Sequence, residues 1–321
     1  MPETFDDLVQ RSCLLDRMRA QLRQLQLVDQ TRGEHDHVTV VPVPSAHGGG
    51  AAKKVFPRGV RRLVLLRGLT IADYHRLAEF SGLESLAVLD GYQLTSLPAL
   101  PMLRVVDLRG SDVRTLSGLE HVEDVYLAGS SRLEDISPLA GARRVWLEAC
   151  SGVRDVAPLA SVAEVALVRM NGLHDLAALS HGSVRRLCCR DMELFTSQPF
   201  HTLAHLTLEN VNLRRGSLLL PADGRHALQS LRLRLVHYRH DAFEALLKGA
   251  EDVAHVAIDA CDTITSAWPF HTARKLSLSN CRSLVDVCAL GGLREVCLAR
   301  CVHLEDVSGV EWLSLPSPCC P

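Results

Sequence analysis

The chain has 321 residues, of which 47% are hydrophobic and 22% are charged, a composition typical of a folded globular protein. Its 35 basic and 37 acidic residues give a net charge of -2, which argues against general binding to nucleic acid or to a membrane surface. The mean hydropathy is +0.09, and no apolar run approaches the roughly 20 residues of a membrane helix. Leucine accounts for 54 residues and aromatic residues for only 4%, so we expect a core of aliphatic side chains.

Residues 1–30 carry apolar side chains at helical spacing, among them Leu8, Leu15, Met18 and Leu22. This pattern predicts an amphipathic helix that either caps the apolar edge of the structure that follows or binds a partner. The first residues have neither the basic nor the apolar region of a secretory signal, so we expect an intracellular, non-secreted protein. Cytoplasmic, cytoskeletal and mitochondrial assemblies all remain open, and most of the eleven cysteines should be free thiols.

Residues 31–58 are polar and contain Gly, His and Pro, which is typical of a linker, although residues 38–42 can pair as an edge strand. The main local basic run lies at the end of the linker, and such a run is usually a solvated approach to the next element. The alternative is a contact with phosphate or with an acidic protein segment. The run comprises Lys53, Lys54, Arg58, Arg61 and Arg62.

A repeated pattern, L-x-x-L-x-L, dominates the chain from residue 60 to about 310. It is clearest in Leu103-x-x-Val106-x-Leu108, and its start-to-start spacings are 19 to 25 residues. The last two apolar positions are two residues apart, so the pattern predicts a strand with those residues on one face. One unit cannot bury its own apolar face, so neighbouring units must stack into a continuous core. The twelve units begin at Val60, Leu83, Leu103, Val122, Ala142, Val162, Val184, Leu203, Leu228, Val253, Ala273 and Leu293.

A small or polar residue stands three positions after the last apolar residue of many units. We expect it to turn the chain inward and to hydrogen-bond loop backbone. The cysteines at this position should serve as small packing residues and not as redox groups. The clearest cases are Ser111, Ser130, Cys150, Cys261, Cys281 and Cys301.

A second apolar set returns the chain on the opposite side, as in Leu133-x-x-Ile136-x-x-Leu139. Its spacing of three predicts a 3-10 turn, with Ser137 as N-cap and Pro138 as the first helical residue. The two 25-residue units have more room. Residues 241–248, followed by Gly249, read as a true helix with a C-terminal glycine.

These residues resemble the leucine-rich repeat superfamily, and most of all the short cysteine-bearing form L-x-x-L-x-L-x-x-C-x-x-L-x-D-V-x-P-L of trypanosomatid proteins. The resemblance implies an α/β solenoid over residues 59–311, a right-handed arc with a parallel sheet on its concave side and short turns on its convex side. Residues 312–321 would then form a C-terminal cap or tail. The family implies protein binding as the usual role and has no shared catalytic residues. Departures are the small Ala142 and Ala273, Cys189 at a leucine position, and a weak return half after Val184.

The strand register places Tyr126 and Trp146 side by side on the solvent-facing side of the concave sheet. An aromatic pair ringed by charges is typical of a protein-binding hot spot. Alternatively, Trp146 covers the surface by packing on Tyr126 and Arg144, or lies under the linker. The charged positions around the pair are Arg109, Asp124, Arg144, Glu148 and Glu164.

A second patch on the same face contains Arg186, Arg190, Arg232 and Arg234. Asp191 and Glu209 lie among these arginines, so the patch is of mixed charge. It suits an acidic protein segment or an RNA phosphate. Since no aromatic residues are interleaved, stacking of single-stranded nucleic acid is not expected.

Motifs for catalysis or cofactors are missing from the sequence. It contains no C-x-x-C pair, no G-x-G-x-x-G, no P-loop and no G-x-S-x-G, so we expect no enzyme, metal, cofactor or small-molecule substrate. The sequence therefore favours a non-enzymatic scaffold that binds a protein partner on its concave face. Two alternatives stay open: a structural subunit of a large ribonucleoprotein or cytoskeletal or flagellar assembly, and a ubiquitin-ligase substrate adaptor without a recognisable F-box.

Overall fold

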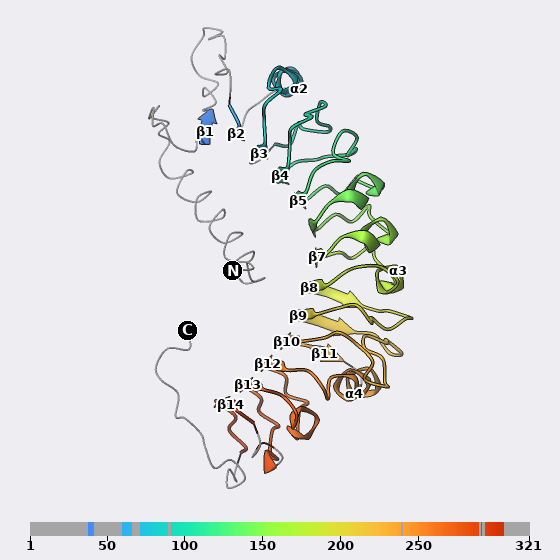
Figure 1. Cartoon of the computed structure of the whole chain (residues 1–321), viewed down its shortest axis with the longest axis vertical. Helices are drawn as coiled ribbons and strands as arrows, with labels where there is room; N and C mark the ends of the chain where they lie inside the picture. The colour runs from blue at the N-terminus through green and yellow to red at the C-terminus, as the bar shows by residue number, and fades with distance from the viewer. Residues whose placement is uncertain are drawn as a thin grey trace.

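A computed structural model describes residues 38–41, 60–65, 71–88, 91–238, 240–288, 290 and 293–304. Over these residues the chain forms a solenoid arc, with strands on the concave side and short helices and turns on the convex side (Figure 1). The predicted helix at 1–30, most of the predicted linker and the predicted tail at 312–321 lie outside the described residues. The expected edge strand at residues 38–42 is present as Val38–Val41.

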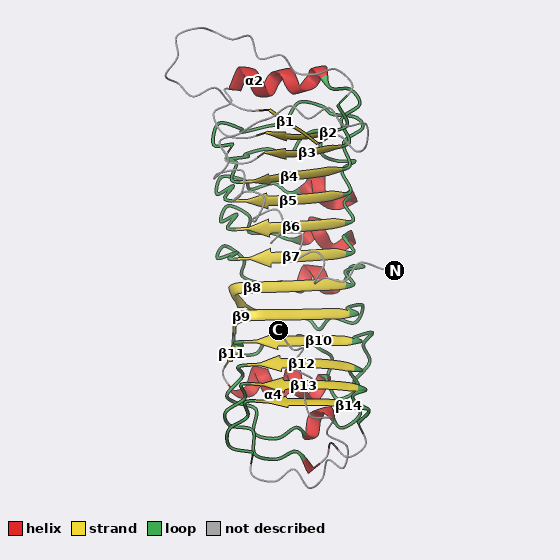
Figure 2. Ribbon diagram, turned by 90° about the vertical axis from the view of Figure 1, so that its left-hand side faces the viewer, coloured by secondary structure: helices red, strands yellow, loops and turns green. Residues whose placement is uncertain are grey.

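The strands form one 14-stranded parallel sheet in which β1 to β10 follow one another in chain order and β12 to β14 continue the path. Strand β11 lies off this path and pairs with β9. Viewed from the concave side, the strands lie side by side across the long axis of the molecule, and most helices lie behind them (Figure 2). The strands are β1 Val38–Val41, β2 Arg62–Leu65, β3 Ser85–Val88, β4 Val105–Arg109, β5 Asp124–Ala128, β6 Arg144–Glu148, β7 Glu164–Val168, β8 Arg186–Leu194, β9 His205–Leu213, β10 Ser230–Arg234, β11 His237–Tyr238, β12 His255–Asp259, β13 Lys275–Ser279 and β14 Glu295–Ala299.

The return segments are short because a typical unit leaves only 15 residues between strands, such as 129–143 between β5 and β6, and two turns must be made within them. The longest described helix, α4, lies in a 25-residue unit and confirms the helix expected at 241–248. The helices are α2 Ile71–His75, η1 Arg76–Glu79, η2 Ser137–Gly141, η3 Ala157–Ser161, α3 Ala177–Ser180, α4 His240–Gly249 and η4 Trp268–Phe270.

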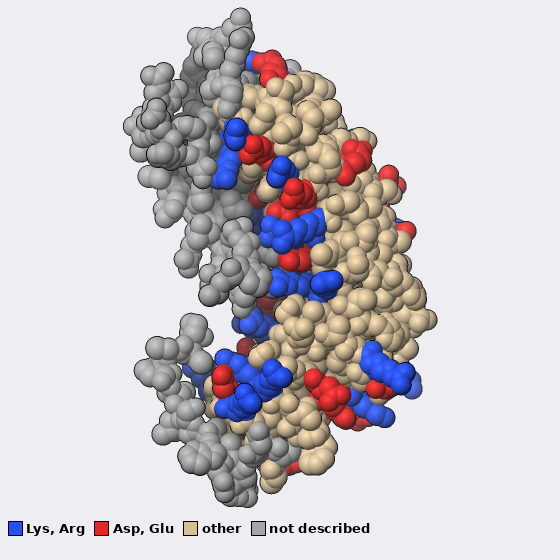
Figure 3. All heavy atoms as spheres, in the orientation of Figure 1, with Lys and Arg blue, Asp and Glu red and all other residues tan. Residues whose placement is uncertain are grey.

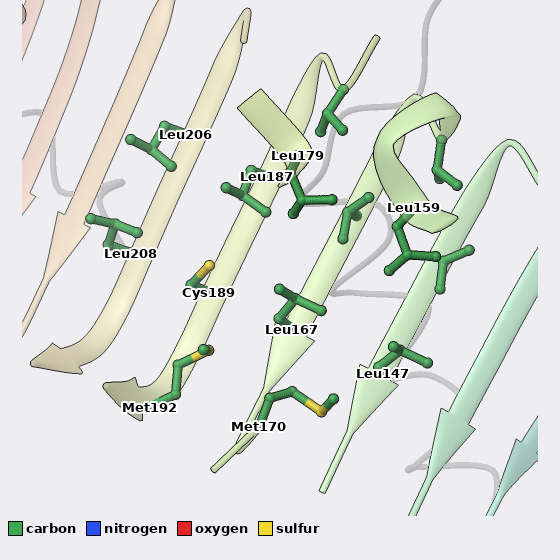
Figure 4. Packing of buried hydrophobic residues seen from close by; sticks show 14 of the residues in the cluster. Leu147, Leu159, Leu167, Met170, Leu179, Leu187, Cys189, Met192, Leu206 and Leu208 are labelled. Atoms are coloured by element: carbon green, nitrogen blue, oxygen red, sulfur yellow. The ribbon is translucent and has the colours of Figure 1, made fainter. Parts of the chain in front are cut away.

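The core is a column of equivalent side chains, one from each turn of the solenoid. Leu108, Leu127, Leu147 and Leu167 pair in register across β4 to β7, and each is fully buried. Figure 4 shows the same column passing from Leu147 and Leu167 to Cys189 on β8, which is also fully buried. The predicted stacked core is therefore confirmed, and the thiol at Cys189 simply takes a leucine's place in it.

A left-handed residue turns the chain inward at the end of most strands. In the cysteine-bearing repeats the inward cysteine follows Ala149 (φ 51°), Ala260 (φ 53°), Asn280 (φ 52°) or Arg300 (φ 56°). The thiol of Cys150 then donates to the carbonyl oxygen of Glu148 at 3.5 Å, while the hydroxyl of Ser130 donates to Ser111 O at 3.1 Å. The predicted inward turn is confirmed, and so is its backbone bond except at Ser111, whose buried hydroxyl makes no hydrogen bond to any described residue. The left-handed conformation of the residue before the turn was not predicted, because glycine is the usual sequence signal for it and most of these positions are not glycine.

The start of each return segment differs from the expectation. Residue Ile136, not Ser137, occupies the N-cap of η2, and no side-chain cap bond is made there. Instead the carboxylate of Asp135 accepts the backbone N–H of Ser137 at 2.8 Å, and Asp155 does the same for Ala157. A carboxylate reaches an N–H two residues ahead and satisfies it better than a serine already inside the tight turn. Pro138 is therefore the second residue of η2, not the first as predicted.

The weak return half after Val184 is replaced by longer strands. Strands β8 and β9 each have nine residues and continue past the usual turn. Their extensions pair in register, so that Met192 lies beside Val211 and Leu194 beside Leu213, all four buried. The apolar residues Met192 and Leu194 are two positions apart, which is the spacing of a strand. This segment therefore continues β8 and does not form a 3-10 turn.

Candidate functional site on the concave sheet

The middle row of the concave face contains an apolar cluster centred on Trp146. The register sets Tyr126 beside Trp146, Trp146 beside Ala166, and Ala166 beside Cys188. Together with Val168 these residues form a cluster separate from the solenoid core. The indole therefore lies on the concave face as predicted, not in the interior.

Trp146 is more enclosed than the sequence suggested. Only 7% of its surface is exposed, its neighbour Cys188 is 5% exposed, and Tyr126 is partly buried. Its indole N–H donates to Glu148 Oε2 at 3.3 Å. Middle-row side chains lie about 4.8 Å apart and converge on the inside of an arc, so they exclude water from one another. Trp146 is thus a packed residue with a satisfied N–H, and the expectation that it faces solvent was wrong.

Arg109 was also expected to be exposed, and only 4% of it is. Its guanidinium makes a two-pronged bond to Asp107, with Nε 3.0 Å from Oδ1 and Nη2 2.8 Å from Oδ2. The guanidinium also lies over the ring of Tyr126, 5.9 Å from its centroid. Asp107 neutralises the charge of Arg109, so the guanidinium can be buried against Tyr126. Arg109 therefore covers one end of the aromatic cluster.

Ion pairs link neighbouring strands along both sides of the middle row. On the side where strands begin, Arg144 binds Asp124 through Nε–Oδ1 at 2.7 Å, and Arg186 lies 3.6 Å from Glu164. Equivalent positions on adjacent strands alternate in charge, which is the arrangement that stabilises a ladder. Figure 3 shows acidic and basic side chains interleaved along the concave side.

The other flank, where strands end, carries a second ladder. Arg234 lies 2.9 Å from Glu209 and 3.3 Å from Asp259, while Arg190 lies 3.7 Å from Glu209. Glu148 pairs with Arg169 nearer the aromatic cluster. The expected mixed patch is therefore an alternating network whose charges largely neutralise one another.

The basic run is only partly described. Lys53, Lys54 and Arg58 lie outside the described residues, whereas Arg61 and Arg62 are exposed at the start of β2. Arg61 lies 3.4 Å from Glu84 on the neighbouring repeat. At the described end of the basic run, a glutamate therefore lies beside the arginines, so this surface is of mixed charge.

The concave sheet is open toward its C-terminal half. Arg234, His255 and Lys275 are exposed along its borders. The middle row consists of the exposed Arg232 and the small, half-buried side chains Thr207, Ala257 and Ser277. We call this strip, from β9 to β13, the open concave face. The enclosed aromatic cluster lies at its upstream end, and burial lowers the pKa of His205 at that boundary, with Arg186 and His255 adding to the effect.

Among the hollows that the described residues line, two lie close to the sheet. One beside Tyr126 and Trp146 has a volume of about 20 Å³, room for about one water. The other, of about 590 Å³, lies at the edge where strands end and is lined by Met170, Asn171, Leu173, His174, Glu193 and Arg214. Sequence reasoning missed the larger hollow, because its lining comes from turns and from the extensions of β8 and β9.

The described cysteines are all free thiols, and no group of three or more His, Cys, Asp or Glu side chains among the described residues is arranged to hold a metal. Burial raises the pKa of Cys150 to about 11 and that of Cys188 to about 12. Thiols with such values are inert at neutral pH. In the described part of the chain no helix has the length and apolarity needed to cross a bilayer.

Comparison with known proteins adds little beyond the fold. No model of a known protein family matches the chain, and no curated protein matches it. Among solved structures, an internalin from Listeria monocytogenes is 16% identical, with a TM-score of 0.45, over 78% of this chain and 76% of that one. At that level the likeness carries no argument. The repeat and its stacked parallel strands decide the matter. The chain folds as a solenoid of stacked L-x-x-L-x-L units.

Proposed function

We propose that the protein is a non-enzymatic scaffold that binds a protein partner along its concave sheet. The observation that carries the proposal is the open concave face, a strip of small, half-buried side chains around the exposed Arg232, bordered on both sides by charge. Small residues such as Ala257 and Ser277 let a partner backbone approach the sheet closely. The bordering side chains Arg234, His255 and Lys275 can then fix its position.

The signs of the bordering charges favour a polypeptide over a polyanion. Arg234 lies between Glu209 and Asp259, so a phosphate chain following this row would meet a carboxylate at every second strand. A polypeptide with both acidic and basic side chains can form ion pairs with the alternating charges of this row. No charge that the complex buries is then left without an opposite charge. An acidic residue on the partner would meet Arg232 or Arg234, and a basic one Glu209.

The aromatic cluster gives the strip a defined upstream end. We propose that the partner contacts the partly buried ring of Tyr126 and the heads of Arg144, Glu148 and Glu164, with Trp146 holding that ring in place from beside it. Aromatic groups supported by charged neighbours are typical of the few residues that dominate binding energy. Loss of the Trp146 indole should therefore weaken partner binding by about 2 kcal/mol.

The repeat type is proposed on the residues alone. Cys150, Cys261, Cys281 and Cys301 recur at the inward turn, and Asp135 and Asp155 recur before the return segment. We assign these repeats to the short cysteine-bearing form. An intracellular role as a subunit of a larger complex fits that assignment and its free thiols.

Site-specific photocrosslinking tests the proposal. A photoreactive phenylalanine analogue at position 232 samples the open concave face, and the same analogue at Ala140, exposed on η2, is the convex control. We expect one protein to be captured at 232 and not at 140, with little change between low and moderate salt. Capture at 140 alone, or equal capture at both, would refute the concave site. Capture of RNA that disappears as salt rises would support a phosphate site instead.

A further inference from the structure

Three cysteines form a column at the C-terminal end of the described solenoid. Cys261, Cys281 and Cys301 occupy the same inward turn in successive repeats. The last two follow strands that pair in register, with Ser279 beside Ala299. Adjacent parallel strands are about 4.8 Å apart, which falls within the Cα–Cα range of about 4.4 to 6.8 Å found for disulfides.

The sulfur atoms of the last two cysteines both lie against backbone carbonyl groups at the end of β13. Cys281 donates to Ser279 O at 3.3 Å. Cys301 Sγ is 3.7 Å from Ala299 O on its own strand and also 3.7 Å from Leu278 O on β13. The thiol of Cys301 thus leans toward β13, the strand that leads into Cys281.

The two thiols differ in access and in acidity. Cys281 is fully buried, whereas Cys301 is only partly buried. Interaction with the neighbouring thiol of Cys281 lowers the pKa of Cys301 to about 6, and the same interaction raises the pKa of Cys281. By contrast, burial raises the pKa of Cys261, one repeat upstream, to about 11. Reactivity follows thiolate content and access, so the chemistry of the column centres on Cys301.

We propose that Cys281 and Cys301 form a redox-active dithiol that hydrogen peroxide converts into a disulfide between neighbouring turns of the solenoid. The Cys301 thiolate attacks one peroxide oxygen, the O–O bond breaks, and a sulfenic acid forms with release of one water after protonation. Cys281 then attacks the Cys301 sulfur, loses its proton, and displaces the hydroxyl as a second water. Two thiols and one peroxide thus give one disulfide and two waters.

Each cysteine has a distinct role in this reaction. Cys301 is the attacking thiol because it is accessible and acidic. Cys281 is the resolving thiol because it lies beside Cys301 and is shielded from solvent. Closing the bond requires the two Cβ atoms to approach by about 1 Å from the strand spacing, since the usual Cβ–Cβ separation in a disulfide is about 3.8 Å. The link would tie two repeats together and slow their separation. This inference does not depend on the proposed partner.

Oxidation of the full-length protein tests the inference. A variant carrying Cys288→Ser and Cys297→Ser removes two accessible thiols near the column and serves as the parent. The parent is treated with one equivalent of hydrogen peroxide, alkylated, digested without reductant and analysed by mass spectrometry. We expect a peptide pair joined through Cys281 and Cys301 that dithiothreitol separates.

Three further variants assign the roles. Cys281→Ser should leave a sulfenic acid on Cys301 that dimedone captures at least five-fold more than in the parent. Cys301→Ser should abolish both the link and the capture, and Cys261→Ser should leave the link intact. Circular dichroism confirms that each variant is folded before oxidation. Absence of the 281–301 link in the folded parent, or capture on Cys281 in the Cys301→Ser variant, would overturn the proposal.

Discussion

A glycine-to-alanine exchange at Gly182 tests how closely neighbouring turns of this solenoid approach. Gly182 precedes β8 and lies against the end of η3. A Cβ placed on it would be 1.8 Å from the carbonyl oxygen of Ala160 and 2.5 Å from its carbonyl carbon. The next residue, Ser183, donates its backbone N–H to the same oxygen at 2.7 Å. The alanine therefore clashes with backbone, which cannot rotate out of the way.

The cost follows from these contacts. The new methyl must move at least about 1.2 Å from the oxygen to reach 3.0 Å, and this shift breaks the Ser183 bond. Overpacking of this kind costs about 1–3 kcal/mol, and a lost hydrogen bond costs about 1 kcal/mol. Reduced freedom of the unfolded chain returns about 0.5 kcal/mol. We expect Gly182→Ala to lower the free energy of unfolding by about 2.5 kcal/mol.

Urea unfolding followed by circular dichroism measures the effect, with Gly82→Ala as the matched control. Gly82 stands in the turn before β3, and an added Cβ meets nothing within 4 Å. The control should be neutral or gain up to about 1 kcal/mol. If Gly182→Ala unfolds at the same urea concentration as the control, the turn before β8 does not pack closely against η3.

Three further outcomes are expected. Trp146→Ala should cost about 3 kcal/mol in urea unfolding, because the indole is 7% exposed; an unchanged midpoint would mean that the ring is not packed. Leu235→Asn should gain about 0.5–1 kcal/mol, because Leu235 holds a left-handed φ of 49° that Asn210 adopts in another repeat; a loss of stability would contradict strain there. Hydrogen bonds from Ser137 lower the pKa of Asp135, and bonds from Cys288 and then Ser266 lower that of Asp286. The stability that these two carboxylates add is present above the unfolded pKa of about 3.9 and disappears as pH falls through their lowered folded pKa values. The midpoint of thermal unfolding should therefore fall less with decreasing pH in the Asp135→Asn, Asp286→Asn double variant than in the unsubstituted protein; an equal fall would contradict the argument.

The repeat fold was readable from the chain because its signal is local and periodic. Leu108, Leu127 and Leu147 recur at nearly constant spacing, and two-residue periodicity assigns each to the inner face of a strand. Stacking then follows from the inability of one unit to bury its own apolar face. The neighbours of Tyr126 and Trp146 on the sheet could also be assigned, since register in a parallel ladder follows from the same count.

Exposure and pairing were decided by tertiary structure. The sequence places Trp146 and Arg109 on the concave face but does not reveal that the arc encloses them or that Arg109 is held by Asp107. Side-chain burial depends on curvature and on which neighbours converge, and neither is encoded in spacing. The lowered pKa of Cys301 likewise arises because the preceding turn brings Cys281 beside it, and only stacking brings together these residues twenty positions apart.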